Sequence, residues 1–144
     1  MSSVLNIVIL VNTILFVLLS LIHIYWLFGG QLGIDKAIPK KENGEYSFWP
    51  GKAMTLAVAV GLLFFAFITF SFIKFGNYSI EFPFKIYAMW FIVIIFYLRS
   101  VGDFKHIGFF KKTKNTVFSK YDTKIYNPLS VYIATSSLFI MVIS

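Results

Sequence analysis

Residues 99–129 read R-S-V-G-D-F-K-H-I-G-F-F-K-K-T-K-N-T-V-F-S-K-Y-D-T-K-I-Y-N-P-L, the one long segment of the chain that is neither uniformly apolar nor a simple linker. This segment holds seven of the thirteen basic residues, two of the six acidic residues and one of the two histidines. Nearly everything outside it is long apolar runs. We therefore take residues 99–129 as the part around which the rest of the chain is organised.

The composition is typical of a membrane protein. Hydrophobic residues make up 58% of the 144 residues and charged residues 13%, against about 45–50% and about 25% in soluble domains. The chain has no cysteine, which excludes disulfides, thiolate metal sites and cysteine nucleophiles. Basic loops beside membrane spans account for the net charge of +7. We therefore expect no nucleic-acid partner.

Four apolar runs predict an all-α integral membrane protein, a four-transmembrane-helix bundle that forms one domain over residues 1–144. About 20 residues suffice to cross the hydrocarbon core. The spans are predicted at 4–28, 52–73, 83–101 and 126–144. Gly29 and Gly30 end the first span, Pro50 precedes the second, and Pro128 falls in the first turn of the last, where proline is tolerated.

Small and polar residues recur at helical spacing within the spans, and we expect these faces to pack against other helices. The polar stripe of the first span consists of Asn6, Thr13 and Ser20. The small-residue rows are Ala53, Ala57 and Gly61 in the second span and Ser130, Ala134 and Ser137 in the last. Oligomerisation or contact with another protein through the row of the second span is left open.

The basic residues are divided unevenly between the two ends of the bundle. Eleven belong to loops 29–51 and 102–125, with Lys52 and Arg99 assigned to these loops, whereas only Lys74 and Lys85 belong to the other end. Lysine and arginine are enriched in cytoplasmic loops. We therefore expect a multi-pass inner-membrane protein with both loops in the cytoplasm and both termini outside.

The loop before the last span is expected to lie partly in the plane of the membrane, because its lysines alternate with aromatic residues. Clustered lysines beside a span also attract anionic lipids, so membrane lipids are the expected partners. Two short helices are predicted in this loop. The apolar side of the first is Phe104, Ile107 and Phe110, and that of the second is Phe118, Tyr121 and Ile125.

The candidate chemistry lies in the same loop. Arg99 and Asp103 are four residues apart, which predicts an ion pair at a helix end, while the alternative is that Arg99 clamps a phosphate or carboxylate. Asp122 is expected to cap a helix or turn. His23 and His106 are the only histidines. They lack the companion motif of a haem protein and the spacing of a zinc site, so neither haem nor metal is indicated.

Taken together, several motifs resemble the small four-span bacterial membrane family known as domain of unknown function 3995. They are H-I-Y-W-L-F-G-G at 23–30, Pro39, F-W-P-G at 48–51, R-S-V-G-D-F-K-H-I-G-F-F-K at 99–111 and T-V-F-S-K-Y-D-T-K-I-Y-N-P-L at 116–129. The resemblance implies four spans over essentially the whole chain but no activity. It points at His23, Trp26, Gly30, Arg99, Gly102, Asp103, Gly108, Thr116, Asp122, Tyr126 and Pro128. His106 departs from the family pattern.

Three functions are consistent with these residues, and the sequence does not decide whether the protein is an enzyme. The first is binding of an anionic lipid or amphiphile headgroup at a cytoplasmic polar cluster. The second is a lipid- or quinone-modifying enzyme that uses His23 with Arg99 and Asp103. The third is a transporter accessory or immunity-type partner protein. The expected polar cluster consists of His23, Trp26, Arg99, Asp103, Thr116, Asp122 and Tyr126.

Overall fold

The computed structural model describes residues 2–41, 43–74 and 80–144, and over these residues the protein is helical and contains no strand. The elements are α1 (Ser2–Leu27), α2 (Ile34–Ala37), α3 (Lys52–Phe70), α4 (Lys85–Val101), α5 (Val117–Tyr121), the π-helix η1 (Asp122–Tyr126) and α6 (Asn127–Ile143). The all-α class is therefore confirmed for the described part of the chain.

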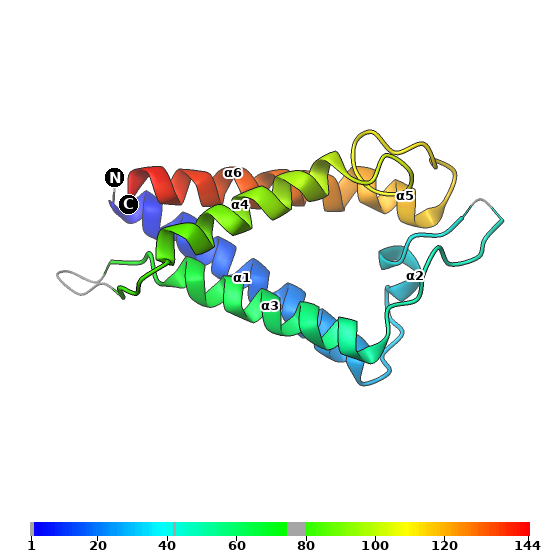
Figure 1. Cartoon of the computed structure of the whole chain (residues 1–144), viewed down its shortest axis with the longest axis horizontal. Helices are drawn as coiled ribbons and strands as arrows, with labels where there is room; N and C mark the ends of the chain where they lie inside the picture. The colour runs from blue at the N-terminus through cyan, green and yellow to red at the C-terminus, as the bar shows by residue number, and fades with distance from the viewer. Residues whose placement is uncertain (1, 42, 75–79) are drawn as a thin grey trace.

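The four long helices form two antiparallel pairs, in which α1 packs along α3 and α4 packs along α6. The two pairs converge at the end that carries both chain termini and diverge toward the end that carries α2 and α5 (Figure 1). The molecule is consequently a wedge. Loops 29–51 and 102–116 both lie at its wide end.

Three helices in the described residues are long and apolar enough to cross a membrane: Ser3–Leu27, Lys52–Phe70 and Val117–Ile143. The last begins earlier than predicted, because α5, η1 and α6 form one continuous helix instead of a short helix followed by a span starting near Tyr126. The predicted third span corresponds to α4, whose 17 residues extend about 25 Å.

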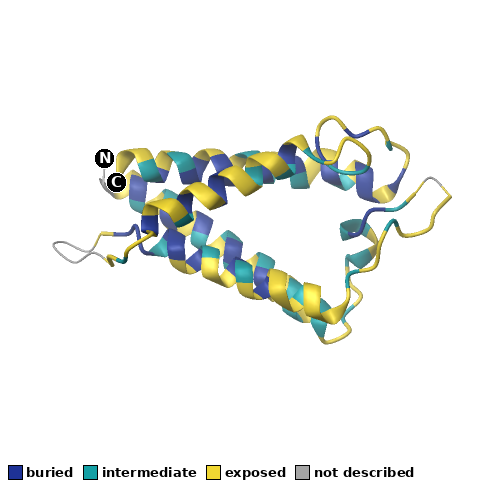
Figure 2. Cartoon of the chain, in the orientation of Figure 1, coloured by how far each residue is buried: buried dark blue, intermediate teal, exposed yellow. Residues whose placement is uncertain are grey.

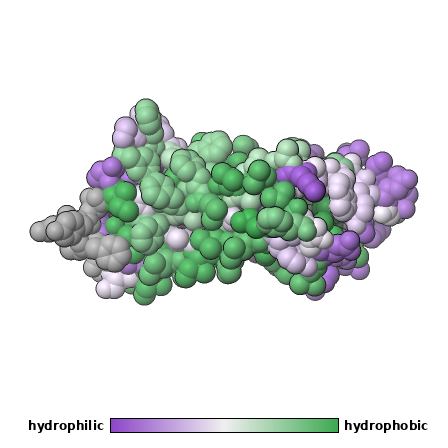
Figure 3. Space-filling view, turned by 90° about the horizontal axis from the view of Figure 1, so that it is seen from below, coloured by the Kyte–Doolittle hydropathy of each residue, from purple (hydrophilic) through white to green (hydrophobic). Residues whose placement is uncertain are grey.

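The hydrophobic core lies between the two helix pairs toward the narrow end of the wedge. It includes Ile9 and Phe16 of α1, Met89 of α4 and Ile140 of α6, all fully buried. Most outward-facing residues of the long helices are exposed (Figure 2). These outer faces are nevertheless apolar, and the hydrophilic surface gathers toward the ends of the molecule (Figure 3). An apolar belt with polar ends is what a bilayer-spanning bundle requires.

Asn12 joins the two helix pairs within this core. Its side chain is fully buried, and its Nδ2 donates to the Ser136 hydroxyl of α6 at 2.8 Å. The same hydroxyl donates to Asn12 Oδ1 at 3.0 Å. Hydrogen bonds between polar side chains across helices are a recurring means of association in membrane bundles. The α1–α6 contact is therefore held by a polar pair as well as by apolar packing.

The predicted polar stripe of the first span is only partly correct. The Ser20 hydroxyl is buried and donates to the Ala59 carbonyl of α3 at 2.7 Å, as a helix contact should. The Thr13 hydroxyl instead donates to the Ile9 carbonyl of its own helix at 2.8 Å. Asn6 is half-buried. The residue that bonds across to α6, Asn12, lies outside the predicted stripe.

The two small-residue rows have opposite outcomes. Ser130, Ala134 and Ser137 of α6 are buried as expected. The prediction that the α3 row packs against a helix is wrong, because Ala53 and Ala57 are exposed and a Cβ added at Gly61 would have no neighbour within 4 Å. The α3 face that packs on α1 carries Ala59 instead. Gly61 and Ala57 therefore face open space between the helix pairs.

Replacing Asn12 with alanine should lower the free energy of unfolding in detergent by about 1–2 kcal/mol, because the side-chain hydrogen bonding between α1 and α6 is lost. Asn6→Ala on the same helix is the matched control and should cost clearly less. A double-mutant cycle with Ser136→Ala measures the coupling between the two side chains. Additive effects of the two substitutions, or an equal cost at Asn6, would contradict the assignment.

Candidate functional site

Asp122 is the centre of a buried polar cluster at the wide end of the wedge. Its side chain is 0% exposed, and two cations from other segments contact it. Arg99 Nη2 lies 2.6 Å from Oδ1, and Lys111 Nζ lies 2.9 Å from Oδ2. The Gly108 N–H also donates to Oδ2, at 3.0 Å. These charge-assisted hydrogen bonds satisfy a carboxylate that has no access to water.

The π-helix η1 lets one arginine bond two acceptors of the same helix. Arg99 Nη1 donates to Asn127 Oδ1 at 3.3 Å while Nη2 contacts Asp122. In a regular α-helix, residues five apart are about 140° apart around the axis. In η1 the Asn127 N–H donates to the Asp122 carbonyl, so one turn contains an additional residue and both side chains face Arg99. Such bulges occur frequently at functional sites.

Lys111 reaches Asp122 because loop 102–111 folds back onto the end of α4. Gly102 and Gly108 both have positive φ, and a Cβ on either would lie 2.6 Å from the Cα of the other. Only glycine permits this approach. The Phe109 N–H then donates to the Ser100 carbonyl at 2.9 Å. The close backbone contact thus positions the Gly108 N–H and the Lys111 side chain beside Asp122.

The predicted ion pair between Arg99 and Asp103 is wrong, because α4 ends at Val101 and the chain turns away from the helix axis. Asp103 Oδ1 instead accepts the backbone N–H groups of Lys105, His106 and Ile107 at 2.9, 2.7 and 2.9 Å. The short helix expected around residues 104–110 does not form either. Instead of a helix, residues 103–107 form a turn that the Asp103 carboxylate stabilises.

The pKa of Asp103 reflects the same contacts. Partial burial acts to raise it, but the backbone hydrogen bonds from Ile107, His106 and Lys105 outweigh this effect, and the pKa lies below its usual value. A carboxyl whose folded pKa is depressed stabilises the fold fully above its unfolded pKa. That contribution is lost as the pH falls through the folded pKa, so the turn weakens only in acid.

Loop 29–51 crosses from the α1–α3 pair to the opposite helix pair and covers the polar cluster. The Tyr126 hydroxyl donates to the Lys36 carbonyl at 3.1 Å. The Lys36 ammonium lies 5.1 Å from the centroid of the Tyr121 ring. Ser47 Oγ lies 3.5 Å from His106 Nε2. The two predicted loops therefore contact each other at the same end of the molecule.

A chamber of about 1240 Å³ lies between the helix pairs beneath this cover. Its walls are mostly apolar and include Ile22, Ala57, Gly61 and Phe96. Few of its lining residues are charged or polar, and these are His23, Tyr25, Trp26, Lys36, Arg99, Tyr126 and Ser130. Such a combination of apolar walls with a few polar groups is typical of sites for amphiphilic ligands.

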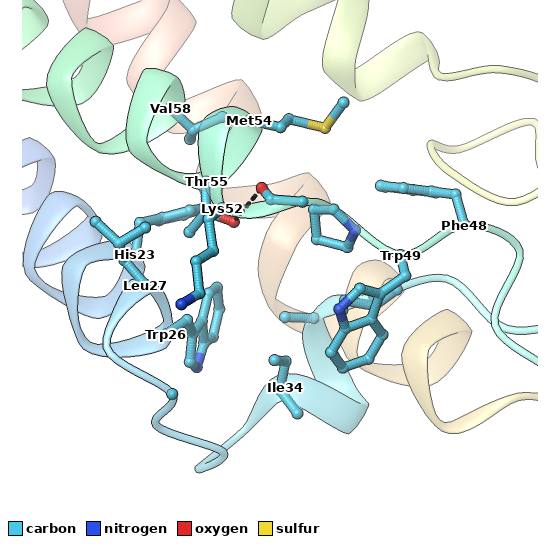
Figure 4. A pocket seen from close by; sticks show the side chains of 15 residues that line it. His23, Trp26, Leu27, Ile34, Phe48, Trp49, Lys52, Met54, Thr55 and Val58 are labelled. Atoms are coloured by element: carbon cyan, nitrogen blue, oxygen red, sulfur yellow. Dashed lines mark hydrogen bonds between the residues drawn. The ribbon is translucent and has the colours of Figure 1, made fainter.

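A second cavity of about 540 Å³ adjoins the chamber between the end of α1, α2 and the start of α3. Trp26 and Trp49 lie on opposite sides of it, and His23 and Thr55 line its other walls (Figure 4). The Trp26 indole N–H donates to the Leu32 carbonyl at 3.0 Å, and its ring centroid lies 5.0 Å from that of His23. The aromatic wall is therefore fixed in place.

The other predicted residues have local structural roles. Thr116 is the N-cap of α5 and accepts the Ser119 N–H at 3.1 Å. A Cβ at Gly30 would clash with the Tyr25 ring, and Gly29 has φ +91°. Pro50 lies just before α3, and Pro128 lies in the first turn of α6, as predicted. The structure thus places His23, Trp26, Arg99 and Tyr126 around the chamber, with Asp122 buried against Arg99, while Asp103 and Thr116 shape the loop beside it.

The cluster carries an excess of positive charge. Arg99 and Lys111 contribute two positive charges, and Asp122 contributes one negative charge. Lys111 is buried, whereas the Arg99 side chain is 30% exposed and lines the chamber. The unbalanced charge is therefore presented through Arg99 to the chamber, where low polarity strengthens electrostatic attraction.

Over the described residues, no group of three or more metal-ligating side chains is present.

The family model described as "Protein of unknown function (DUF3995)" matches residues 16–137, which include every element of the chamber and the polar cluster. The chain belongs to the DUF3995 family. No curated protein and no solved structure is significantly similar to it. Arguments about the function of this DUF3995 protein therefore depend on its own geometry.

Three important residues of this DUF3995 chain were missed by sequence reasoning. Lys111 was counted among the loop lysines, although it is 5% exposed and bonds Asp122. Asn127 is fully buried against Arg99, and Lys36 joins loop 29–51 to the other helix pair. Asn127 beside Pro128 was available as a signal, since a polar residue inside an apolar span needs a partner. No local signal distinguishes Lys111 from its neighbours.

Asp122→Asn should destabilise the DUF3995 protein by about 3–5 kcal/mol, because it leaves two cations without their shared carboxylate. Adding Lys111→Met should recover part of this loss by removing the fully buried charge. Asp103→Asn at pH 7 is the control and should have a much smaller effect. Thermal unfolding in detergent measures all three. A mild effect of Asp122→Asn, similar to that of Asp103→Asn, would show that Asp122 is not the centre of the cluster.

Proposed function

We propose that the protein crosses the bacterial inner membrane four times, with loops 29–51 and 102–125 in the cytoplasm and both termini outside. The apolar belt supports this arrangement, as does the placement of both basic loops at one end. α4 packs along α6, and its 17 residues are at the lower limit of about 17–25 for a span. The imbalance of basic residues sets the orientation.

Single-cysteine labelling tests this topology, because the chain has no cysteine of its own. In intact spheroplasts an impermeant maleimide should label Lys74→Cys and Ser144→Cys. Lys41→Cys and Lys112→Cys should react only after permeabilisation. Lys74 precedes α4 and Lys112 follows it, so this pair tests directly whether α4 crosses the membrane. Equal labelling of these two positions in intact spheroplasts would show that α4 does not cross.

We further propose that the protein binds an anionic amphiphile, with the headgroup at Arg99 and the hydrocarbon chains in the chamber. One observation carries this proposal: the excess positive charge of the Arg99–Asp122–Lys111 cluster faces a chamber whose walls are mostly apolar and whose other polar residues are few. The planar guanidinium of arginine suits both phosphate and carboxylate groups. Arg99 Nη1 and Nη2 are held by Asn127 and Asp122, so the group is oriented in advance.

The size and position of the chamber support a ligand with hydrocarbon chains. Its volume of about 1240 Å³ exceeds the ~300–1000 Å³ of ordinary small-molecule sites. Ala57 and Gly61 are small residues on the α3 wall of the chamber. Neither residue fills the space between the helix pairs. The failure of this row to pack against a helix is then explained by the ligand chains that occupy the space beside it.

Gly61→Leu should abolish co-purification of the amphiphile, because the added side chain projects into the chamber. Folding should be preserved, since nothing lies within 4 Å of the new Cβ and leucine favours helix. Val60→Leu is the matched control, at an exposed adjacent position outside the chamber. Native mass spectrometry in mild detergent should show a discrete added mass in the wild type and the control. Wild-type protein carrying only random phospholipid would refute ligand binding.

A further inference from the structure

The structure determines how the His23 side chain can bond a ligand. His23 Nδ1 lies 2.7 Å from the Leu19 carbonyl oxygen. A carbonyl oxygen can only accept a hydrogen bond, so Nδ1 must be the nitrogen that carries the proton. In the neutral imidazole the other nitrogen, Nε2, then holds a free lone pair. Nε2 has no hydrogen-bond partner among the described residues, which leaves it available as an acceptor.

The His23 side chain also lies where the two cavities meet. It lines both the chamber of about 1240 Å³ and the adjoining cavity of about 540 Å³. Trp26, Ala37, Met54 and Val58 line both cavities as well. The two spaces therefore adjoin at the wide end, and His23 belongs to the walls of both.

We propose that His23 Nε2 accepts a hydrogen bond from a hydroxyl group of the bound amphiphile, and that the ligand is a singly charged phosphodiester lipid with a hydroxylated headgroup. This inference rests on the proposed amphiphile binding and names its ligand class. The phosphodiester balances the single excess charge of the Arg99–Asp122–Lys111 cluster. The hydrocarbon chains occupy the chamber, and the headgroup hydroxyls occupy the smaller cavity.

The chemistry of the smaller cavity suits such a headgroup. His23 supplies an acceptor, and Trp26 and Trp49 supply flat apolar walls (Figure 4). Lys52 adds a further positive charge at the edge of the cavity. A headgroup with an amine would add a third cation to Arg99 and Lys52. Hydroxyl groups add a donor for His23 without that repulsion.

Competition between two lipids tests the inference. Purified protein is mixed with equal amounts of phosphatidylglycerol and phosphatidylethanol that have identical acyl chains, and native mass spectrometry measures the bound ratio. Both lipids carry one negative charge, and only phosphatidylglycerol has headgroup hydroxyls. The wild type should prefer phosphatidylglycerol by about five- to tenfold, the effect of one net hydrogen bond. Equal binding of both would overturn the hydroxyl contact and leave amphiphile binding intact, whereas binding of neither would overturn amphiphile binding itself.

Two isosteric substitutions then separate the roles of the two ring nitrogens. Asparagine places an amide near the position of Nδ1, and glutamine places one near the position of Nε2. His23→Asn should reduce the preference to about one, while both lipids still bind through Arg99. His23→Gln should keep most of the preference. The reverse pattern would assign the role of His23 to its bond with Leu19 and overturn the proposal. The wild-type competition decides the matter even if one variant does not fold.

Discussion

The wide end of the molecule depends on one buried carboxylate that is shared by two cations. Asp122 on the α5–η1–α6 helix forms ion pairs with Arg99 at the end of α4 and with Lys111 in the loop that follows α4. Removing an ionised group from water is costly unless its partners and hydrogen bonds are all in place. Each segment is therefore positioned by a requirement of the same carboxylate. The close approach of Gly102 and Gly108 and the bulge at η1 are the backbone adjustments that meet this requirement.

The narrow end is organised differently. There Asn12 and Ser136 form a polar contact within apolar packing, and the two helix pairs lie close together. Toward the wide end the pairs separate, and loop 29–51 connects them again, through Lys36 with Tyr126 and Tyr121. The chamber exists because the helices are held together at one end and bridged by a loop at the other. Mostly apolar side chains and the partly exposed Arg99 guanidinium face the space between.

Much of this architecture follows from the apolar runs, and little of the site does. The run ending at Val101 and the run beginning at Lys52 coincide with α4 and α3, because span length and loop polarity are set by local sequence. The pairing of Arg99 with Asp122 instead of Asp103 depends on where α4 ends and on an additional residue in the helical turn at η1. Neither leaves a periodic signal. The burial of Lys111 is likewise set by a backbone contact between two glycines, and its sequence neighbours are ordinary loop residues.

The wedge has a mechanical consequence for any bilayer that it crosses. Because the helix pairs converge at the end with the termini and diverge at the other, the protein takes up more lateral area in one leaflet than in the other (Figure 1). Lipids on the narrow side must spread to fill the difference, unless the membrane bends toward that side. In a bilayer, the same splaying that opens the chamber thus favours one sign of membrane curvature over the other.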